Sequence, residues 1–246
     1  MGAAGAGEAT VDVSDVFSNY VYTGNGGTQT ITNGIDLSGE GGLVWVKRRS
    51  VSFSHVLSDT ANGGGKYLSS NLTDSISTTT SDINAFNSDG FTIGSSNGVN
   101  TSGQTYVSWT FRKAPKFFDV VTYTGDGVAG RTVAHNLGQE VGMLVVKKTS
   151  GTGFWPVFHR ANTSAPETDV LILNEIYSTT DGVTFWNDTL PTDVDFTVGT
   201  ADNTNASGET YVAYLFAHDT DPDEGMIQCG SYTGTGYGGQ HEGDAC

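Results

Sequence analysis

Short apolar runs and alternating segments follow one another along this chain, and they have the spacing of strands. Residues 43–46 and 143–146 are continuous apolar runs bounded by glycine and lysine, which is typical of strands buried on both faces. Residues 105–111 and 210–216 alternate, and both alternating sets contain large side chains, which predicts central strands. No stretch keeps a 3.6-residue period for three turns. Helix is therefore expected only as a turn or two, near residues 81–86.

The same sequence blocks occur twice, in the same order. Tyr-Thr-Gly stands at residues 22–24 and again at 123–125, with a third copy at 232–234. Blocks beginning at Gly42, Phe91 and Gly103 recur 100, 105 and 105 residues later. Turn signals such as Gly-Asn-Gly and Asn-Gly separate the strand signals. This pattern predicts one antiparallel β-sandwich in each repeat.

The predicted fold class is all-β, with two tandem antiparallel β-sandwich units of jelly-roll type and the start of a third. Prolines at 115 and 222 lie near the unit ends and predict short, extended connectors. The predicted segments are an N-terminal arm (1–15), unit one (16–117), unit two (118–224) and a truncated third unit or docking tail (225–246).

Composition and net charge exclude some classes of binding partner. The 246 residues carry 11 Lys and Arg against 27 Asp and Glu, a formal net charge of -16. A surface so acidic repels a phosphate backbone, so we expect no nucleic-acid partner. No run of 18 apolar residues occurs, so no membrane insertion is expected, and residues 1–15 lack a signal-peptide pattern.

Several blocks resemble one family of proteins. Residues 22–26, 33–47, 86–94 and 106–119 resemble phage virion proteins, often described as tail-fibre or tail-appendage proteins, which carry tandem units of this kind. The resemblance covers nearly the whole chain apart from residues 1–14 and the tail after Gly236. It implies a structural role in the phage tail and brings no catalytic motif.

Under this interpretation the expected partners are other virion proteins, copies of the chain in a homotrimer, and a host cell-surface glycan. No catalytic residue and no cofactor are expected. One alternative is a capsid decoration or cement protein built from the same units. Another is a glycan-binding or glycan-cleaving module, although cleavage needs paired carboxylates in one groove and the acidic clusters here lie in different units.

Basic side chains end two equivalent predicted strands. Lys47, Arg48 and Arg49 end one, and Lys147 and Lys148 end the other. Their simplest role is to protect a sheet edge against unwanted pairing. The functional alternative is contact with an acidic neighbouring subunit.

Aromatic side chains are the candidates for recognition. Trp155 and Trp186 flank loops rich in glycine and aspartate, and with Tyr177 they are the candidates for exposed rings that could stack on a sugar. Trp45 and Trp109 lie within strand runs and are expected in the core.

An acidic segment offers weak candidates for a metal site. Asp219, Asp221 and Asp223 stand at alternate positions, as in loops that bind hard cations. Glycine is one place late for such a loop and no distal Glu follows, so a solvated linker is the simpler interpretation.

Two further residue types have structural interpretations. His135 lies in an apolar setting at a position that matches Asn33 of the first repeat, which predicts a turn-capping or strand-end role. Cys229 and Cys246 both lie in the last 18 residues and cannot cross-link the preceding fold. A reduced Cys229 within a strand is expected, and a disulfide between the two remains an alternative.

Overall fold

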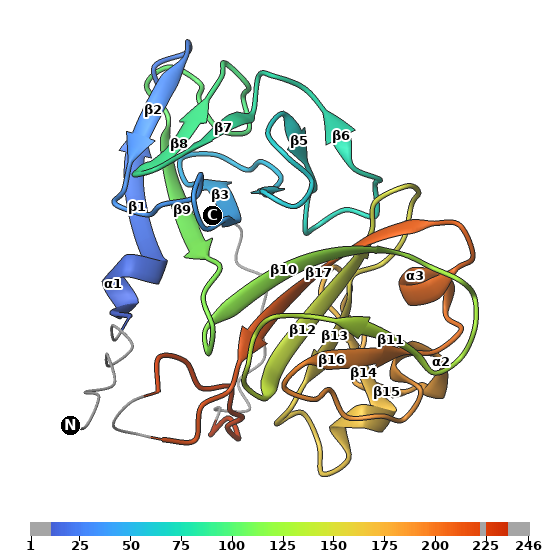
Figure 1. Ribbon diagram of the computed structural model, residues 1–246. Helices are drawn as coiled ribbons and strands as arrows, with labels where there is room; N and C mark the ends of the chain where they lie inside the picture. The colour runs from blue at the N-terminus through green and yellow to red at the C-terminus, as the bar shows by residue number, and fades with distance from the viewer. Residues whose placement is uncertain (1–10, 222–224, 236–246) are drawn as a thin grey trace, which may run out of the picture.

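Strands form most of the regular secondary structure, and the described helices are limited to single turns (Figure 1). The computed structural model describes residues 11–221 and 225–235. Its strand pairs are antiparallel. The chain is therefore a mostly β protein with several antiparallel sheets and few short helices.

Two groups of strands follow one another along the chain, here called the first half (11–117) and the second half (118–221 with 225–235). The strands of the first half are β1 (Phe17–Thr23), β2 (Gln29–Thr32), β3 (Gly42–Arg48), β4 (Val56–Asp59), β5 (Lys66–Tyr67), β6 (Ser77–Thr78), β7 (Ile83–Asn87), β8 (Gly90–Ile93) and β9 (Thr105–Arg112). Those of the second half are β10 (Phe118–Thr124), β11 (Arg131–Ala134), β12 (Val141–Lys148), β13 (Pro156–His159), β14 (Asp169–Ile172), β15 (Thr180–Asp181), β16 (Asp195–Val198) and β17 (Thr210–Ala217). The helical turns are α1 (Val13–Val16), α2 (Val183–Trp186), α3 (Asp202–Asn205) and the 3-10 turn η1 (Pro166–Thr168).

The order of paired strands in the first half is repeated in the second. The sheet β1-β9-β3-β4 corresponds to β10-β17-β12-β13, and the pair β2-β8 corresponds to β11-β16. β9 and β17 are central, as their two large-residue faces predict. β7 extends the first pair, and β14 and β15 extend the second large sheet.

The expectation of a helical turn at residues 81–86 is wrong. Most of this segment belongs to β7, which pairs with β8 across a turn at residues 88–89. Pairing with a neighbouring strand satisfies the backbone groups that a lone helical turn would leave open.

The repeated Tyr-Thr-Gly blocks have a common structural role. Tyr22 stacks on Tyr106 with ring centroids 5.2 Å apart, and Tyr123 stacks on Tyr211 at 5.1 Å. These pairs lie opposite each other in the register of β1 with β9 and of β10 with β17. Each pair thus packs at the same position in its half, where the first strand pairs with the central strand.

The glycine of each block is required by close backbone approach. A Cβ on Gly24 would lie 2.3 Å from the carbonyl oxygen of Thr101, and one on Gly125 would lie 2.2 Å from that of Ala206. Contacts this short do not occur, so any larger residue would push the loops apart.

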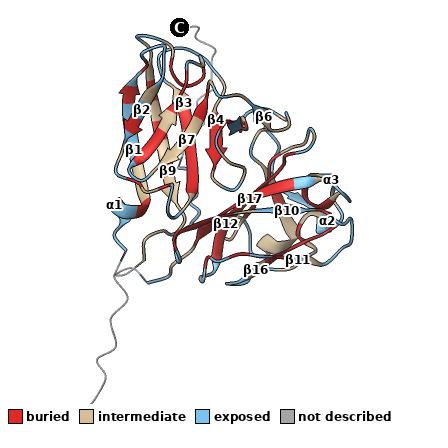
Figure 2. Ribbon diagram, turned by 45° about the horizontal axis from the view of Figure 1, so that its top comes forward, coloured by how far each residue is buried: buried red, intermediate tan, exposed pale blue. Residues whose placement is uncertain are grey.

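Buried residues form one core in each half and a third between the halves (Figure 2). The core of the first half lies between its two larger sheets. Its members include Tyr22, Ile31, Val44, Val46, Ile83, Phe91, Ile93 and Tyr106. The core of the second half includes Tyr123, Val133, Leu144, Val146, Phe158, Trp186, Phe196, Val198 and Tyr211.

The connection between the halves is not the extended connector expected near Pro115. Ala114 forms a β-bridge with Phe118 across a tight turn, and Lys116 in that turn has a φ of 61°. Ala114, Phe117 and Phe118 are all buried in the core shared by the halves. The connection is therefore held by packing on both sides.

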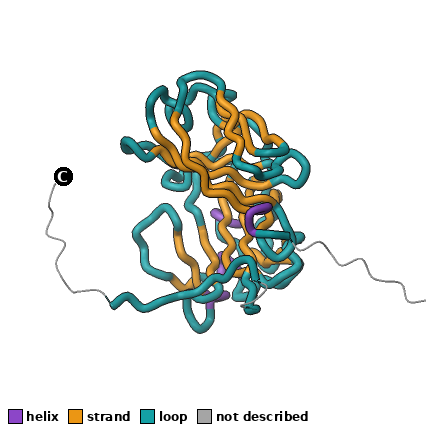
Figure 3. Tube along the Cα trace, turned by 90° about the vertical axis from the view of Figure 1, so that its left-hand side faces the viewer, coloured by secondary structure: helices purple, strands orange, loops and turns teal. Residues whose placement is uncertain are grey.

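The sequence predicts that a third unit opens with a strand after residue 225. This prediction is wrong for the described part of the tail. Residues 225–235 form a loop (Figure 3), and within it Met226 and Ile227 pack against the cores. The backbone N–H of Asp219 donates to the carbonyl of Ile227 at 3.0 Å. β1 and β10 are strands because β9 and β17 pair with them, whereas no described strand pairs with residues 225–235.

Candidate functional site

The most distinctive feature is a buried junction between the halves. The loop between β5 and β6 lies on the outer face of the sheet that contains β12 and β17, where its backbone accepts and donates hydrogen bonds. The indole N–H of Trp155 donates to the carbonyl of Leu72 at 2.9 Å, and the N–H of Gly153 donates to that of Thr73 at 2.8 Å. The N–H of Ile76 donates to the carbonyl of Thr149 at 3.0 Å.

The shared core continues this junction with apolar and aromatic side chains. Phe111 meets Phe216 edge to face, with ring centroids 5.3 Å apart. Two residues of the first half, Leu43 and Leu57, are buried in the same cluster as Val145. The remaining buried members are Val16, Leu68, Ala114, Phe117, Phe118, Val120, Trp155, Val157, Val212, Tyr214 and Phe216.

A buried carboxyl group crosses the junction. Asp59 is the last residue of β4 and is 2% exposed. Its Oδ2 accepts a hydrogen bond from the Tyr214 hydroxyl at 2.9 Å. Burial raises the pKa of Asp59, while hydrogen bonds from Asn62 and Tyr214 act in the opposite direction. Burial also raises the pKa of Tyr214 well above its ordinary value. Each partner satisfies the other's polar atom in an otherwise apolar contact.

Lys147 is fully buried at the same junction. Its Nζ donates to the carbonyls of Thr73 at 3.0 Å and Gly153 at 3.1 Å, and it lies 5.9 Å from the centroid of the Trp155 ring. Burial lowers the pKa of Lys147 to about 8. The amine thus joins the first half to the loop after β12 by contacts to backbone oxygen.

Lys147→Met is expected to change how stability depends on pH. Between about pH 8 and 10.5 the unfolded chain binds a proton that the folded chain does not, so raising the pH through this window favours the folded wild type. The free energy of unfolding of wild type minus that of Lys147→Met should therefore rise, by up to about 3 kcal/mol. Urea unfolding at pH 7.5 and pH 10 measures it.

Buried tyrosines titrate in both proteins and so cancel from that difference. Lys66→Met, which replaces an exposed lysine of β5, is the matched control and should show no such window. A difference between wild type and Lys147→Met that stays constant with pH would contradict the assignment.

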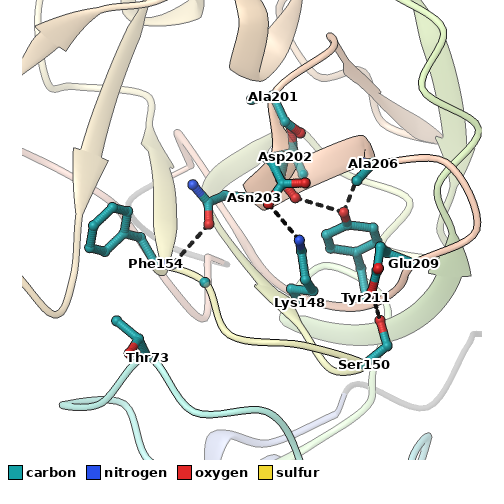
Figure 4. Close-up of polar contacts among 12 residues, drawn as sticks. Thr73, Lys148, Ser150, Phe154, Ala201, Asp202, Asn203, Ala206, Glu209 and Tyr211 are labelled. Atoms are coloured by element: carbon teal, nitrogen blue, oxygen red, sulfur yellow. Dashed lines mark hydrogen bonds and ion pairs between the residues drawn. The ribbon is translucent and has the colours of Figure 1, made fainter.

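A second polar network positions the loop that receives the first half (Figure 4). Lys148 Nζ lies 2.6 Å from Asp202 Oδ2, and the hydroxyl of Tyr211 donates to the Asp202 carbonyl at 2.8 Å. The N–H of Phe154 donates to Asn203 Oδ1 at 2.9 Å. α3 thus contacts both ends of the loop after β12, and these contacts hold the backbone of that loop in place.

A hydroxyl bridge completes this network. Ser150 donates to the carboxylate of Glu209 and accepts the N–H of Thr210 at 2.9 Å. The first half repeats the arrangement, because Ser50 donates to Gln104 at 2.6 Å and accepts the Thr105 N–H at 3.4 Å. The network is thus a repeated feature of the fold.

The basic residues lie where β3 and β12 continue past one of their two neighbouring strands. β4 pairs with β3 only as far as Val46, and β13 pairs with β12 only as far as Val145, so Lys47 and Lys147 are paired on one side, with β9 and β17. Protection of a sheet edge stays a prediction. Lys147 and Lys148 are buried within this chain, so the expectation that they contact another subunit is wrong. A local sequence pattern does not reveal that another part of the chain covers these amines.

The first-half basic residues remain partly accessible. Lys47 is half-buried, and its Nζ donates to the neighbouring carbonyl of Arg48 at 3.1 Å. The Arg48 guanidinium lies 6.0 Å from the centroid of the Phe53 ring, and Arg49 is exposed. Their role as subunit contacts stays a prediction.

Two of the three aromatic candidates for recognition are buried. Trp155 is 0% exposed and Trp186 is 1% exposed, so the expectation that they are available to a sugar is wrong. Trp186 donates from its indole nitrogen to the carbonyl of Asp169 at 3.0 Å. Tyr177 is 60% exposed and remains a candidate. Trp45, expected in the core, is only half-buried.

The acidic segment forms a turn in its described part. The carboxylate of Asp219 accepts the N–H of Asp221 at 2.9 Å, and Asp223 lies outside the described residues. Within residues 11–221 and 225–235, no group of three His, Cys, Asp or Glu side chains is arranged to hold a metal ion.

The turn-capping prediction for His135 is confirmed. Its Nδ1 accepts the N–H of Leu137 at 3.2 Å, and the matching Asn33 accepts the N–H of Ile35 at 3.3 Å. Burial lowers the pKa of His135, despite the opposing effect of Asp119. The histidine therefore acts as a neutral acceptor.

Cys229 is half-buried, and its N–H donates to Nδ1 of His218 at 3.1 Å. It lies in the tail loop, so its expected position in a strand is wrong. Cys246 lies outside the described residues, so a bond between the two stays untested.

A shallow cleft of about 310 Å³ opens where the halves meet. Its lining is mostly polar, with Asn62 and Lys66 from the first half and the hydroxyls of Thr122, Thr149 and Thr210 from the second. Sequence reasoning missed this cleft and the junction beneath it. The available signal was the pair of large faces on β17, but β9 has the same pattern and its outer face is only half-buried, so the pattern does not say which face is covered.

The site and the fold define a mostly β protein whose two halves are joined by a buried junction. The chain belongs to the DUF7483 family, a domain of unknown function, whose family model matches residues 12–240. No curated protein matches the chain. None of the helices in the described part has the length and apolar character needed to span a membrane.

Proposed function

We propose that this chain is a structural protein of a phage particle, in its tail, as a tail fibre or appendage that takes part in assembly and host attachment. The sequence resemblance to virion proteins supports the proposal. The observation that carries it is the buried junction, because a body that transmits force needs its units packed together. Asp59 and Tyr214 make such a contact across the halves.

In this proposal the two halves are tandem antiparallel β-sandwich units of jelly-roll type. The repeated strand order and the repeated Tyr–Tyr stacking support that description. The expected partners are other virion proteins and further copies of the chain, as a homotrimer. The net charge of -16 favours protein partners over nucleic acid.

Host recognition through a glycan is a weaker part of the proposal. Burial of Trp155 and Trp186 removes two of its three aromatic candidates, and Tyr177 remains. No catalytic role is proposed, since the side chains of the polar network in Figure 4 hold the backbone of the loop after β12 in place.

Quantitative mass spectrometry of purified particles tests the proposal. We expect the chain in a handful to tens of copies per particle, counted against the major capsid protein in the same digest, and gold-labelled antibody on the tail. Hundreds of copies spread over the capsid would instead support the decoration protein. Absence from the particles would contradict both.

A further inference from the structure

The outer face of the large sheet is buried along β12 and β17 in the second half. In the first half only its Leu43 end is buried in the shared core, Trp45 packs partly against that core, and the rest of the face is accessible. In the register of β12 with β17, Val145 lies opposite Tyr214 and Lys147 opposite Val212, and all four are buried by the first half. In the register of β3 with β9, the equivalent pairs are Trp45 with Trp109 and Lys47 with Val107. These four are only half-buried.

The open face continues beyond these pairs. Val21 lies opposite Val107 and is 54% exposed, and Phe53, which stands where the second half has Gly153, is 42% exposed. We call Val21, Trp45, Lys47, Val107 and Trp109 the open face. An apolar surface with two tryptophans and a lysine beside them is typical of a contact surface.

The loop that covers the second half also has an equivalent. Asn71 accepts the N–H of His55 at 3.0 Å, and Asn174 accepts the N–H of Trp155 at 2.9 Å. These matching bonds place residues 173–177, between β14 and β15, at the same position as residues 70–74. We call residues 173–177 the uncovered loop.

The uncovered loop is strongly apolar for a surface segment. Ile176 is 99% exposed, Tyr177 is 60% exposed and Leu173 is 44% exposed. Ile176 stands where the first half has Thr73, the residue whose carbonyl binds Lys147. Each half thus carries one loop and one face, and within residues 11–221 and 225–235 only one of the two possible loop-to-face contacts is made.

We infer that the open face binds the uncovered loop of a second copy of this chain, in the geometry by which the first half covers the second. In that contact the Nζ of Lys47 donates a hydrogen bond to the carbonyl of Ile176. Within one chain this Nζ donates to the carbonyl of the neighbouring Arg48. The contact is heterologous, so it closes into a ring, such as the proposed trimer, or continues as a filament. This inference deepens the proposed assembly role and rests on it for its biological meaning.

Sedimentation of the full chain and of two single variants tests the contact. Ile176→Glu alters the loop, and Val107→Glu alters the face. We expect wild type to form oligomers at micromolar concentration and each variant alone to be monomeric. An equimolar mixture of the two variants should form a dimer, because the intact loop of one meets the intact face of the other.

Val128→Glu changes a 61% exposed valine that lies in neither surface and should associate like wild type. Circular dichroism checks the fold of each variant, and Val21→Glu replaces Val107→Glu if that variant does not fold. A monomeric wild type overturns the inference, as does a mixture that stays monomeric. Removal of residues 236–246 that turns a monomer into an oligomer would show that the chain's own tail occupies the face, which also overturns it. These results are independent of the particle count, which tests the proposed function.

Discussion

Asn205→Ala is expected to lower the free energy of unfolding by about 3–5 kcal/mol. The Asn205 side chain is fully buried, and it accepts the N–H of Asp126 at 3.0 Å. Its amide donates to the carbonyls of Gly199 at 2.8 Å and Val128 at 2.9 Å. Alanine removes the side-chain partner of all three backbone groups. The bond to Gly199 is buried and the other two are part-buried, and each unsatisfied buried group costs about 1–3 kcal/mol.

The first half supplies a matched variant for this test. Asn100 accepts the N–H of Asn25 at 2.7 Å and donates to Gly94 at 2.8 Å and Gly27 at 2.6 Å. Asn100→Ala should therefore cost a similar amount, while Asn19→Ala on the exposed surface of β1 should cost less than about 0.5 kcal/mol. Urea unfolding at neutral pH measures all three. A loss below about 1 kcal/mol for both buried sites would contradict the role of the amide.

Trp155→Ala should destabilise the protein by about 3–5 kcal/mol and weaken the coupling of the halves. The ring is fully buried, stacks near Tyr214 with centroids 6.5 Å apart, and holds the carbonyl of Leu72. Its removal leaves a cavity within the shared core. Calorimetry of wild type should show one transition, and that of the variant two, because the halves then unfold separately.

Two further variants separate the contributions. Trp155→Phe keeps most of the apolar volume but loses the donor to Leu72, so a smaller loss of about 1–2 kcal/mol is expected. Tyr232→Ala changes a side chain that is 94% exposed and should leave the transition in place. A single transition of unchanged midpoint for Trp155→Ala would contradict the role of the junction.

Local sequence patterns predicted the strands well. The apolar runs at 43–46 and 143–146 lie in β3 and β12, and the alternating segments are the central strands β9 and β17. His135 caps a turn, as its match to Asn33 predicts. These features depend on neighbouring residues and on repetition, both of which can be seen in a single sequence.

The candidate site was predicted poorly. Trp155 follows a glycine-rich loop, a local context that suggests exposure, but the first half covers it. Lys147 follows a valine and precedes a basic residue, as Lys47 does, yet the first amine is buried and the second is half-buried. A residue pattern describes which face of a strand a side chain occupies and does not describe what lies over that face.

The sequence by itself determined the main strands, the repeated order of blocks and the turns between strands, because these follow from side-chain periodicity and backbone sterics within a segment. Only the tertiary structure decided which of two nearly identical sheet faces is covered. That choice depends on contacts such as Lys147 with Thr73, between segments 74 positions apart. The free energy of burial depends on the surface that another segment removes from water, and no local pattern contains that information.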